Sequence, residues 1–318
     1  MKMISKIEHI YQYLPLEISD IIKKIPQCEL ESISEIRLRR SKRLSVNTGS
    51  KEYFVTQSGA LTNNYTKGLF VKDEHIARIY QLALRNSVHS FHREIVNGYM
   101  TVDGGCRIGF CGTAVQSETN TSLIENIKDI SSVNIRIARE MIGCADELYR
   151  SLISGGRTGL LIIGPPSSGK TTLIRDLTRQ LGQTMTLSLI DERNEIACVC
   201  GGMPQNDVGQ KTDVFSSYNR YDGIMIAVRV MSPEFIVVDE IGSRDDIEAL
   251  GYALNSGVYI IASCHGAGLR DVRRKTVIRK LIKAGAFGKY AVLGTGIKCG
   301  IITEIGDLSM GEKEKSLC

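Results

Sequence analysis

The sequence predicts a two-domain protein of the α/β class, in which a smaller α+β domain precedes a parallel sheet flanked by helices. Between residues 35 and 140, strand-like segments surround a single helix. From about residue 145, short apolar strands alternate with helices, as in a parallel sheet covered on both faces. Glycines at 141–157 separate the two patterns. We therefore expect domains at 1–145 and 146–318.

The composition is that of a globular protein. Of the 318 residues, 42% are hydrophobic and 24% are charged. A net charge of +5 permits contact with nucleic acid or an anionic membrane without requiring either. Nine cysteines without a recognisable secretory leader favour a reducing cytosol over a disulfide framework. The apolar runs are of strand length, far short of the roughly 18 residues of a membrane span, so membrane association is expected to be peripheral or through partners.

The first domain is expected to begin with two short helices within 1–25, where isoleucines recur at helical spacing and Pro15 interrupts the pattern. A membrane-binding amphipathic helix is the alternative, but no face rich in Lys and Arg accompanies the apolar one. Alternating apolar residues predict a strand pair within 36–46. Further strands are expected at 53–55, 100–102, 107–110 and 133–137, and a helix at about 73–92.

The second domain is expected to alternate strands with helices. The expected strands are 159–163, 186–190, 234–239 and 258–263, with later ones near 291–294 and 299–303. The expected helices are 169–181, 216–231 and 243–256. Functional residues should then follow the carboxyl ends of the strands. The charged tail at 312–316 is expected to be disordered.

Residues 164–171 read Gly-Pro-Pro-Ser-Ser-Gly-Lys-Thr between an apolar strand and a helix, the full Walker A pattern. Backbone N–H groups of such a loop favour phosphate oxygens. Lys170 would place a charge at the β and γ phosphates of ATP, and the Thr171 hydroxyl would hold Mg²⁺. Since prolines lack N–H groups, the cradle must come mainly from 167–172. The expected nucleotide-binding residues are Gly164, Pro165, Pro166, Ser167, Ser168, Gly169, Lys170, Thr171 and Thr172.

The apolar strand at 235–238 runs into Asp239 and Glu240, which would face the crevice at the carboxyl end of the sheet. We expect Asp239 to hold Mg²⁺ through water, and Glu240 to orient or deprotonate the attacking water. The structural alternative is an acidic helix cap. The Walker A motif upstream favours the catalytic interpretation.

Two neighbouring strand ends carry further candidates. Glu192 could assist the metal or the water, or form an ion pair with Arg193. His265 could sense the γ-phosphate through a hydrogen bond, or cap a loop. The residues alone leave both questions open.

The order of these motifs resembles the type II and type IV secretion ATPases, in which Walker A, Asp box, Walker B and His box follow one another. Several segments look like the stage III sporulation protein AA family, with the resemblance spanning about 30–305. These segments are 35–39, 104–109, 134–140, 191–197 and 212–214. By position, Glu192 matches the Asp-box acid, Glu240 the Walker B glutamate and His265 the His box. The His box departs from the secretion ATPases, because it reads Ser-Cys-His-Gly.

This resemblance implies a RecA-like ATPase of endospore-forming bacteria. It implies work in the mother cell, as a hexameric ring, at the membrane-embedded channel that links mother cell and forespore. Many type II secretion ATPases carry a tetra-Cys zinc insertion. Here Cys198 and Cys200 have no second pair, so zinc is not expected.

A ring ATPase closes its active site between subunits and brings a cation to the γ-phosphate from a neighbour or another domain. Candidates in the first domain are Arg107, Arg136 and Arg139, while Arg229 and Arg244 bracket Walker B. A surface ion pair is the structural alternative for each of them.

Alternative functions remain. The basic run at 37–43 keeps a nucleic-acid motor open, although its alternation favours the solvated face of a strand and nucleic acid is not the expected partner. A nucleotide-gated structural ring with little turnover is a second alternative. A small-molecule kinase is a third, for which no acceptor site is visible.

Overall fold

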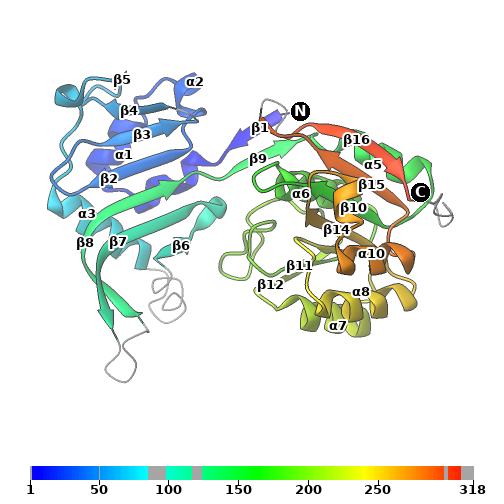
Figure 1. Ribbon diagram of the computed structural model, residues 1–318. Helices are drawn as coiled ribbons and strands as arrows, with labels where there is room; N and C mark the ends of the chain where they lie inside the picture. Colours follow the sequence, from blue (N-terminus) through cyan, green and yellow to red (C-terminus); the bar gives the residue numbers. More distant parts are fainter. Residues whose placement is uncertain (1, 50, 85–97, 117–123, 297–299, 309–318) are drawn as a thin grey trace. The chain divides into compact units, whose positions relative to one another are not determined.

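The computed structural model describes residues 2–49, 51–84, 98–116, 124–296 and 300–308. The chain forms two compact units, which Figure 1 colours along the sequence. The N-terminal unit consists of Met3–Glu140 and Cys200–Gln205. The C-terminal unit consists of Met1–Lys2, Met141–Val199 and Asn206–Cys318.

The N-terminal unit contains an antiparallel sheet of order β5-β4-β3-β2-β8-β7-β6. Its strands are β2 (Glu35–Arg39), β3 (Ser45–Thr48), β4 (Lys51–Val55), β5 (Leu61–Thr62), β6 (Tyr99–Thr101), β7 (Arg107–Gln116) and β8 (Ile124–Arg136). Apolar side chains of β2 and β8 alternate inward, so that Ile36 and Ile135 are fully buried. The strands expected from the alternating pattern are therefore confirmed.

Helices cover the apolar face of this sheet (Figure 1). They are η1 (Ile7–Tyr13), α1 (Leu16–Ile22), α2 (Gln27–Leu30) and α3 (Asp73–Leu84). Two short 3-10 helices, η2 (Tyr65–Lys67) and η3 (Asp103–Gly105), lie outside this core. The expectation of two packed helices at the start is confirmed, because Ile10 and Ile18 are fully buried against the sheet, although the first is a 3-10 helix. The expected helix at 73–92 corresponds to α3, which is described as far as Leu84. The remainder of the expected range lies outside the described residues.

A short pair, β1 (Lys2–Ser5) with β9 (Arg139–Ile142), was not predicted.

The C-terminal unit contains a second sheet, of order β12-β11-β13-β14-β10-β15-β16. Its strands are β10 (Leu160–Gly164), β11 (Leu187–Asp191), β12 (Thr212–Ser216), β13 (Phe235–Val238), β14 (Tyr259–His265), β15 (Lys289–Leu293) and β16 (Ile302–Asp307). All neighbours are parallel except β15 and β16. The sheet is therefore mixed rather than wholly parallel, because the chain returns along the edge after β15 instead of crossing over through a helix.

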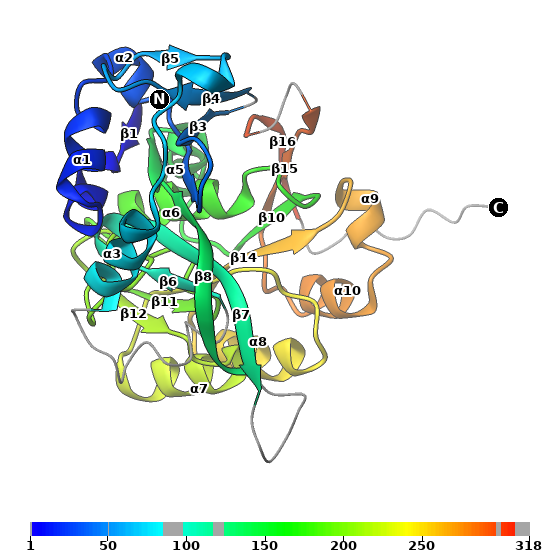
Figure 2. The same cartoon turned by 90° about the vertical axis from the view of Figure 1, so that its left-hand side faces the viewer.

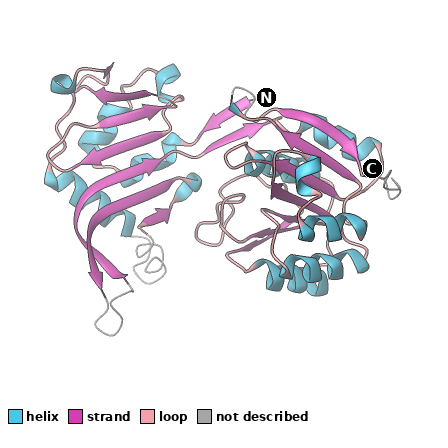
Figure 3. Cartoon of the chain, viewed as in Figure 1, coloured by secondary structure: helices cyan, strands magenta, loops and turns pink. Residues whose placement is uncertain are grey.

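Helices cover both faces of this sheet, as Figures 2 and 3 show. They are α5 (Asp146–Ser154), α6 (Lys170–Leu181), α7 (Arg220–Val230), α8 (Asp245–Asn255), α9 (Leu269–Val272) and α10 (Thr276–Lys283). Apolar residues of α5 and α6 share one core with the sheet, and those of α7, α8 and α10 share the other. Because both faces are covered, all five residues of β10 are buried. Sequence reasoning missed β12, α9 and α10.

No helix within the described segments combines the length and apolar character needed to cross a bilayer. The tail at 312–316, expected to be disordered, lies outside the described residues.

Candidate nucleotide-binding site

The candidate residues of the C-terminal unit follow four neighbouring strands at the same edge of the sheet. Gly164 of β10 stands opposite His265 of β14 in the parallel register, and Val238 of β13 stands opposite Ala262. On the other side of β13, Ile190 of β11 pairs with Val238. The loops after these strands therefore emerge together, where ligands bind in open α/β sheets.

The phosphate loop is closely packed around two of its glycines. A Cβ on Gly164 would lie 2.3 Å from the Ser168 hydroxyl. Gly169 has a φ of +95°, and a Cβ there would lie 3.1 Å from the Cα of Gly300. Gly300 also donates its N–H to the Ser168 carbonyl over 3.0 Å. Helix α6 then begins at Lys170, so its first N–H groups lack partners within the helix and are available for phosphate.

Lys170 is buried at the centre of the loop, with all three ammonium protons engaged. Its Nζ lies 3.1 Å from the Gly164 carbonyl, 2.9 Å from the Pro165 carbonyl and 3.2 Å from His265 Nδ1. Burial lowers the pKa of Lys170, which the nearby carboxylates of Asp239 and Glu240 oppose. Because an ammonium only donates, Nδ1 accepts, and this geometry assigns the ring proton of a neutral His265 to Nε2.

Thr171 and Asp239 bring the two motifs together. The Thr171 hydroxyl donates to Asp239 Oδ2 over 2.9 Å. The other oxygen, Oδ1, accepts the Ser263 hydroxyl and, over 3.0 Å, the backbone N–H of Glu240. A hydroxyl and a carboxylate are oxygen ligands of the kind that Mg²⁺ prefers. The buried Ser168 hydroxyl has no hydrogen-bond partner among the described residues. These donors fit a phosphate group with its magnesium ion.

Glu240 has a constrained backbone and a side chain that is held at both oxygens. Its φ is +52°, in the left-handed region that non-glycine residues rarely adopt. Its Oε1 lies 3.1 Å from His265 Nε2, and its Oε2 lies 2.6 Å from Arg193 NH1. The alternative in which Glu192 forms an ion pair with Arg193 is wrong, because Arg193 forms its ion pair with Glu240.

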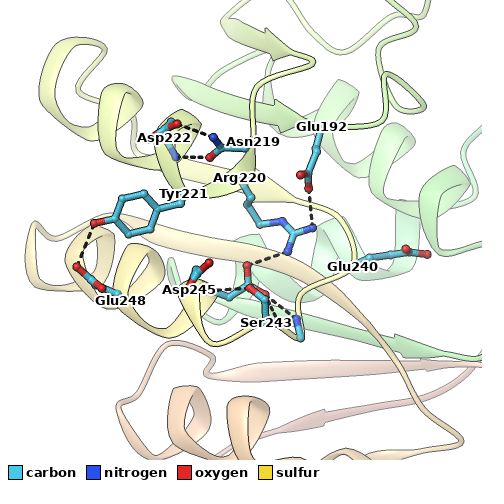
Figure 4. A pocket seen from close by; sticks show the side chains of 11 residues that line it. Glu192, Asn219, Arg220, Tyr221, Asp222, Glu240, Ser243, Asp245 and Glu248 are labelled. Atoms are coloured by element: carbon cyan, nitrogen blue, oxygen red, sulfur yellow. Dashed lines mark hydrogen bonds and ion pairs between the residues drawn. The ribbon is translucent and has the colours of Figure 1, made fainter. Parts of the chain in front are cut away.

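Glu192 instead pairs with Arg220, which sequence reasoning did not single out. Arg220 lies 3.1 Å from Glu192 Oε2 (Figure 4). It also lies 2.8 Å from Asp246 Oδ1. The buried Asp246 also accepts the N–H groups of Gly242, over 2.6 Å, and Ser243, over 2.7 Å. Arg220 therefore ties the Glu192 strand end to the loop after Walker B. The sequence did offer one sign of this role. Arg220 is a cation in the first turn of α7, where the helix dipole favours acidic residues instead.

Burial alone would raise the pKa of the Asp246 carboxyl, but hydrogen bonds from Gly242, Arg220 and Ser243 hold this pKa below its ordinary value. Asp246 lines an open cleft of about 790 Å³ together with Glu192 and Glu240. In Figure 4 the side chain of Glu240 extends away from the Arg220 cluster, toward the opposite side of its loop.

The arginine candidates lie elsewhere in their own units. Arg107 lies over the Tyr99 ring at 5.3 Å. Arg136 lies 3.8 Å from Glu35. Arg139 donates to the Ser32 carbonyl, and burial lowers its pKa.

Within the C-terminal unit, Arg229 lies over the Tyr252 ring at 6.0 Å. It is about 13 Å further along α7 than Arg220. Arg244 precedes α8 without a capping hydrogen bond from its side chain, and it lines a second groove with Lys280. Among the described residues, Glu192 and Glu240 pair with Arg220, Arg193 and His265 rather than with either of these arginines.

Comparison with solved structures establishes the fold class. The chain superposes on the ATPase DotB of Legionella pneumophila with a TM-score of 0.54 at 12% identity, covering 88% of this chain and 76% of that one. It superposes on the pilus retraction motor PilT with bound ADP with a TM-score of 0.55 at 16% identity, covering 87% and 77%. The fold is that of the RecA-like secretion ATPases, as the sequence predicted.

The protein belongs to the family described as Sporulation stage III, protein AA, which matches residues 4–313. It is 33% identical over 304 residues to stage III sporulation protein AA of Bacillus subtilis (strain 168), which covers 94% of each chain. Over 166 residues it is 32% identical to Protein SEEDLING PLASTID DEVELOPMENT 1 of Arabidopsis thaliana, covering 51% of this chain and 24% of that protein. The resemblance stated from the motifs is confirmed.

Proposed function

We propose that the protein is a Mg-dependent P-loop ATPase of the secretion type, which energises or assembles the channel complex between mother cell and forespore during endospore formation. Family membership supports the sporulation setting. The observation that carries the ATPase proposal is the hydrogen bond of 2.9 Å between Thr171 and Asp239, with Glu240 on the next position. This contact supports the proposal because it joins the proposed phosphate loop to the proposed metal ligand Asp239, next to the proposed general base.

Each residue then has a defined task. Residues 164–172 bind the phosphates, with Lys170 at the β and γ positions. Thr171 and Asp239 would hold Mg²⁺, whose charge would offset that of the phosphates. Glu240 orients the attacking water and accepts its proton, and Glu192 supports it from the neighbouring strand end. His265 would hydrogen-bond the γ-phosphate from β14.

We propose further that 1–145 and 146–318 act as separate domains and that copies assemble into a hexameric ring. In that ring Arg107, Arg136, Arg139 or Arg229 would bring a cation to the γ-phosphate. The protein would act in the cytoplasm and reach the membrane peripherally, through membrane-embedded channel proteins.

ATP hydrolysis by the wild type and Glu240→Gln, with mass determination with and without ATP, tests this function. The wild type should hydrolyse ATP as an oligomer, whereas Glu240→Gln should bind ATP and turn it over about 10²- to 10⁴-fold more slowly. Glu248→Gln is the matched control, because Glu248 lies in the same cleft but pairs with Tyr221. A wild type that binds ATP, stays monomeric and hydrolyses nothing would contradict the proposal.

The same variants separate the alternatives. In a structural ring, Lys170→Ala would break assembly while Glu240→Gln would leave function intact. A nucleic-acid motor would show DNA-stimulated hydrolysis with a steep salt dependence. The basic run does not favour it, since Arg37 pairs with Glu35, Arg39 with Glu52 and Arg40 with Asp73.

A further inference from the structure

The carboxylate of Glu240 has both oxygens occupied by cation or N–H donors of its own chain. Arg193 NH1 lies 2.6 Å from Oε2, and His265 Nε2 lies 3.1 Å from Oε1. A general base must come within hydrogen-bond reach of the proton that it abstracts. Each oxygen keeps a second lone pair, but the two donors fix the direction in which the carboxylate faces. The carboxylate can therefore turn toward a water elsewhere in the site only when one of these contacts opens.

The ion pair between Arg193 and the Glu240 side chain is weaker than the hydrogen bonds that fix the Glu240 backbone. The Arg193 side chain is 66% exposed and the Glu240 side chain 23%, and the two form an ion pair. Exposed pairs of this kind contribute little stability because water competes and salt screens them. The backbone of Glu240, by contrast, is fixed, since its N–H donates to Asp239 Oδ1 and to Ser263 Oγ over 3.0 Å each. Opening of the arginine contact is thus the easier motion.

His265 joins this contact to the phosphate loop. Lys170 directs its three protons at the Gly164 carbonyl, the Pro165 carbonyl and His265 Nδ1. A phosphate oxygen that binds Lys170 must replace one of these acceptors. The two carbonyls belong to the backbone of the loop, whereas the His265 ring can turn about its side-chain bonds. Phosphate binding at Lys170 therefore disturbs the ring that holds Oε1.

We propose that Arg193 is a positioning residue that latches the Glu240 carboxylate in an unproductive orientation and limits turnover until the contact opens. The latch consists of Arg193, Glu240 and His265. Its opening frees Oε2, the oxygen that Arg193 occupies, to accept the proton of the attacking water. This inference rests on the proposed ATPase function, because it assigns Glu240 the role of general base.

Steady-state hydrolysis by the full chain tests the latch, with Arg193→Gln as the variant. Removal of the cation should raise kcat about two- to fivefold, the range for loss of an exposed pair. KM for ATP should stay within about twofold of wild type, because Arg193 pairs with Glu240 rather than with the phosphate loop. Arg193→Lys, which keeps the charge, should restore a rate closer to wild type. Arg270→Gln is the matched control, an exposed arginine of α9 in the same unit.

The dependence of kcat on salt concentration provides a second test. A purely structural role of Arg193 would not produce such a dependence. Between 0.1 and 1 M NaCl the Debye length falls from about 10 Å to about 3 Å. Wild-type turnover should therefore rise toward that of Arg193→Gln, and the ratio of their rates should approach one. A double variant with Glu240→Gln should abolish the gain, because the gain passes through Glu240.

The outcomes distinguish the latch from the function on which it rests. If the wild type turns over ATP and Arg193→Gln has an equal or lower kcat, the latch is wrong and the ATPase function stands. If neither protein hydrolyses ATP, the proposed function fails and the latch fails with it.

Discussion

The hydroxyl of Thr171 donates a hydrogen bond to Asp239 Oδ2 over 2.9 Å, which joins the first turn of α6 to the end of β13. The two residues lie 68 positions apart in the sequence. Parallel pairing places β14 between β10 and β13, so the contact spans the strand that ends in His265. The proposed metal ligands are thereby in contact through a hydrogen bond of the protein itself.

Substitution of Thr171 tests this contact. Thr171→Ala should raise the Mg²⁺ concentration for half-maximal hydrolysis on the order of tenfold or more, because the hydroxyl ligand and the orientation of Asp239 are both lost. Thr171→Ser keeps the hydroxyl and should behave like wild type. Affinity for a fluorescent ATP analogue, measured with and without Mg²⁺, supplies a readout independent of turnover. Equal Mg²⁺ dependence in all three proteins would rule out this ligand.

Gly169→Ala should impair both stability and nucleotide binding. A φ of +95° strains any L side chain, and the added Cβ meets Gly300 at 3.1 Å. We expect a loss of about 1–2 kcal/mol in the free energy of unfolding. Gly257→Ala is the control, because its φ is +81° but nothing lies within 4 Å of its Cβ. It should show the backbone strain alone, with unchanged ATP affinity in an equilibrium titration.

Arg220→Ala should destabilise the C-terminal unit by about 2 kcal/mol in urea unfolding, because it leaves the buried Asp246 with one fewer charged donor. It should also lower ATP hydrolysis, since Glu192 loses its partner at 3.1 Å. Arg150→Ala, an exposed arginine on α5, is the control for loss of a surface charge. Unchanged stability together with unchanged turnover would show that Arg220 organises neither carboxylate.

Asp246 should make folding stability depend on pH in acid. Its pKa in the folded protein is held below the unfolded value of about 3.9. The unfolded chain therefore binds the proton first as pH falls. The stabilisation is present above about pH 4 and is lost as pH falls through the folded pKa. Urea unfolding between pH 5 and 3 should show a shallower decline for Asp246→Asn than for wild type, and parallel curves would contradict this assignment.

Much of the C-terminal fold could be predicted because its strands are apolar runs of buried length. The segment at 160–163 is uniformly aliphatic, and the glycines and lysine of the loop that follows have one common structural use. Placement of Asp239 and Glu240 at the sheet edge needed only the rule that parallel strands end together.

Other features left weaker signals. The edge strand β12 reads Thr-Asp-Val-Phe-Ser and is only half buried, so it carries no apolar run. The antiparallel direction of β16 depends on the short connection from β15, and hydrophobic periodicity carries no information about strand direction. Helix α10 did carry a signal, because Val277, Ile278, Leu281 and Ile282 recur at helical spacing.

Side-chain partners within the site could not be predicted, since they depend on where separate loops meet. Arg193 follows Glu192 directly, yet it pairs with Glu240 on another strand end. Arg220 is 28 positions from Glu192 and becomes its partner only when α7 packs beside β11.

The position of β10 in its sheet has a consequence for synthesis of the chain. Both neighbours of this strand, β14 and β15, come later in the sequence, and Tyr259 lies 95 residues beyond Gly164. At about 5–20 residues per second, a nascent chain would carry this fully buried strand unpaired for roughly 5–20 s. The Ser168 carbonyl of the phosphate loop also gains its hydrogen bond from the Gly300 N–H only after residue 300 has been synthesised. Nucleotide-binding competence should therefore appear late in translation, and β10 is the segment on which aggregation or a chaperone would act first.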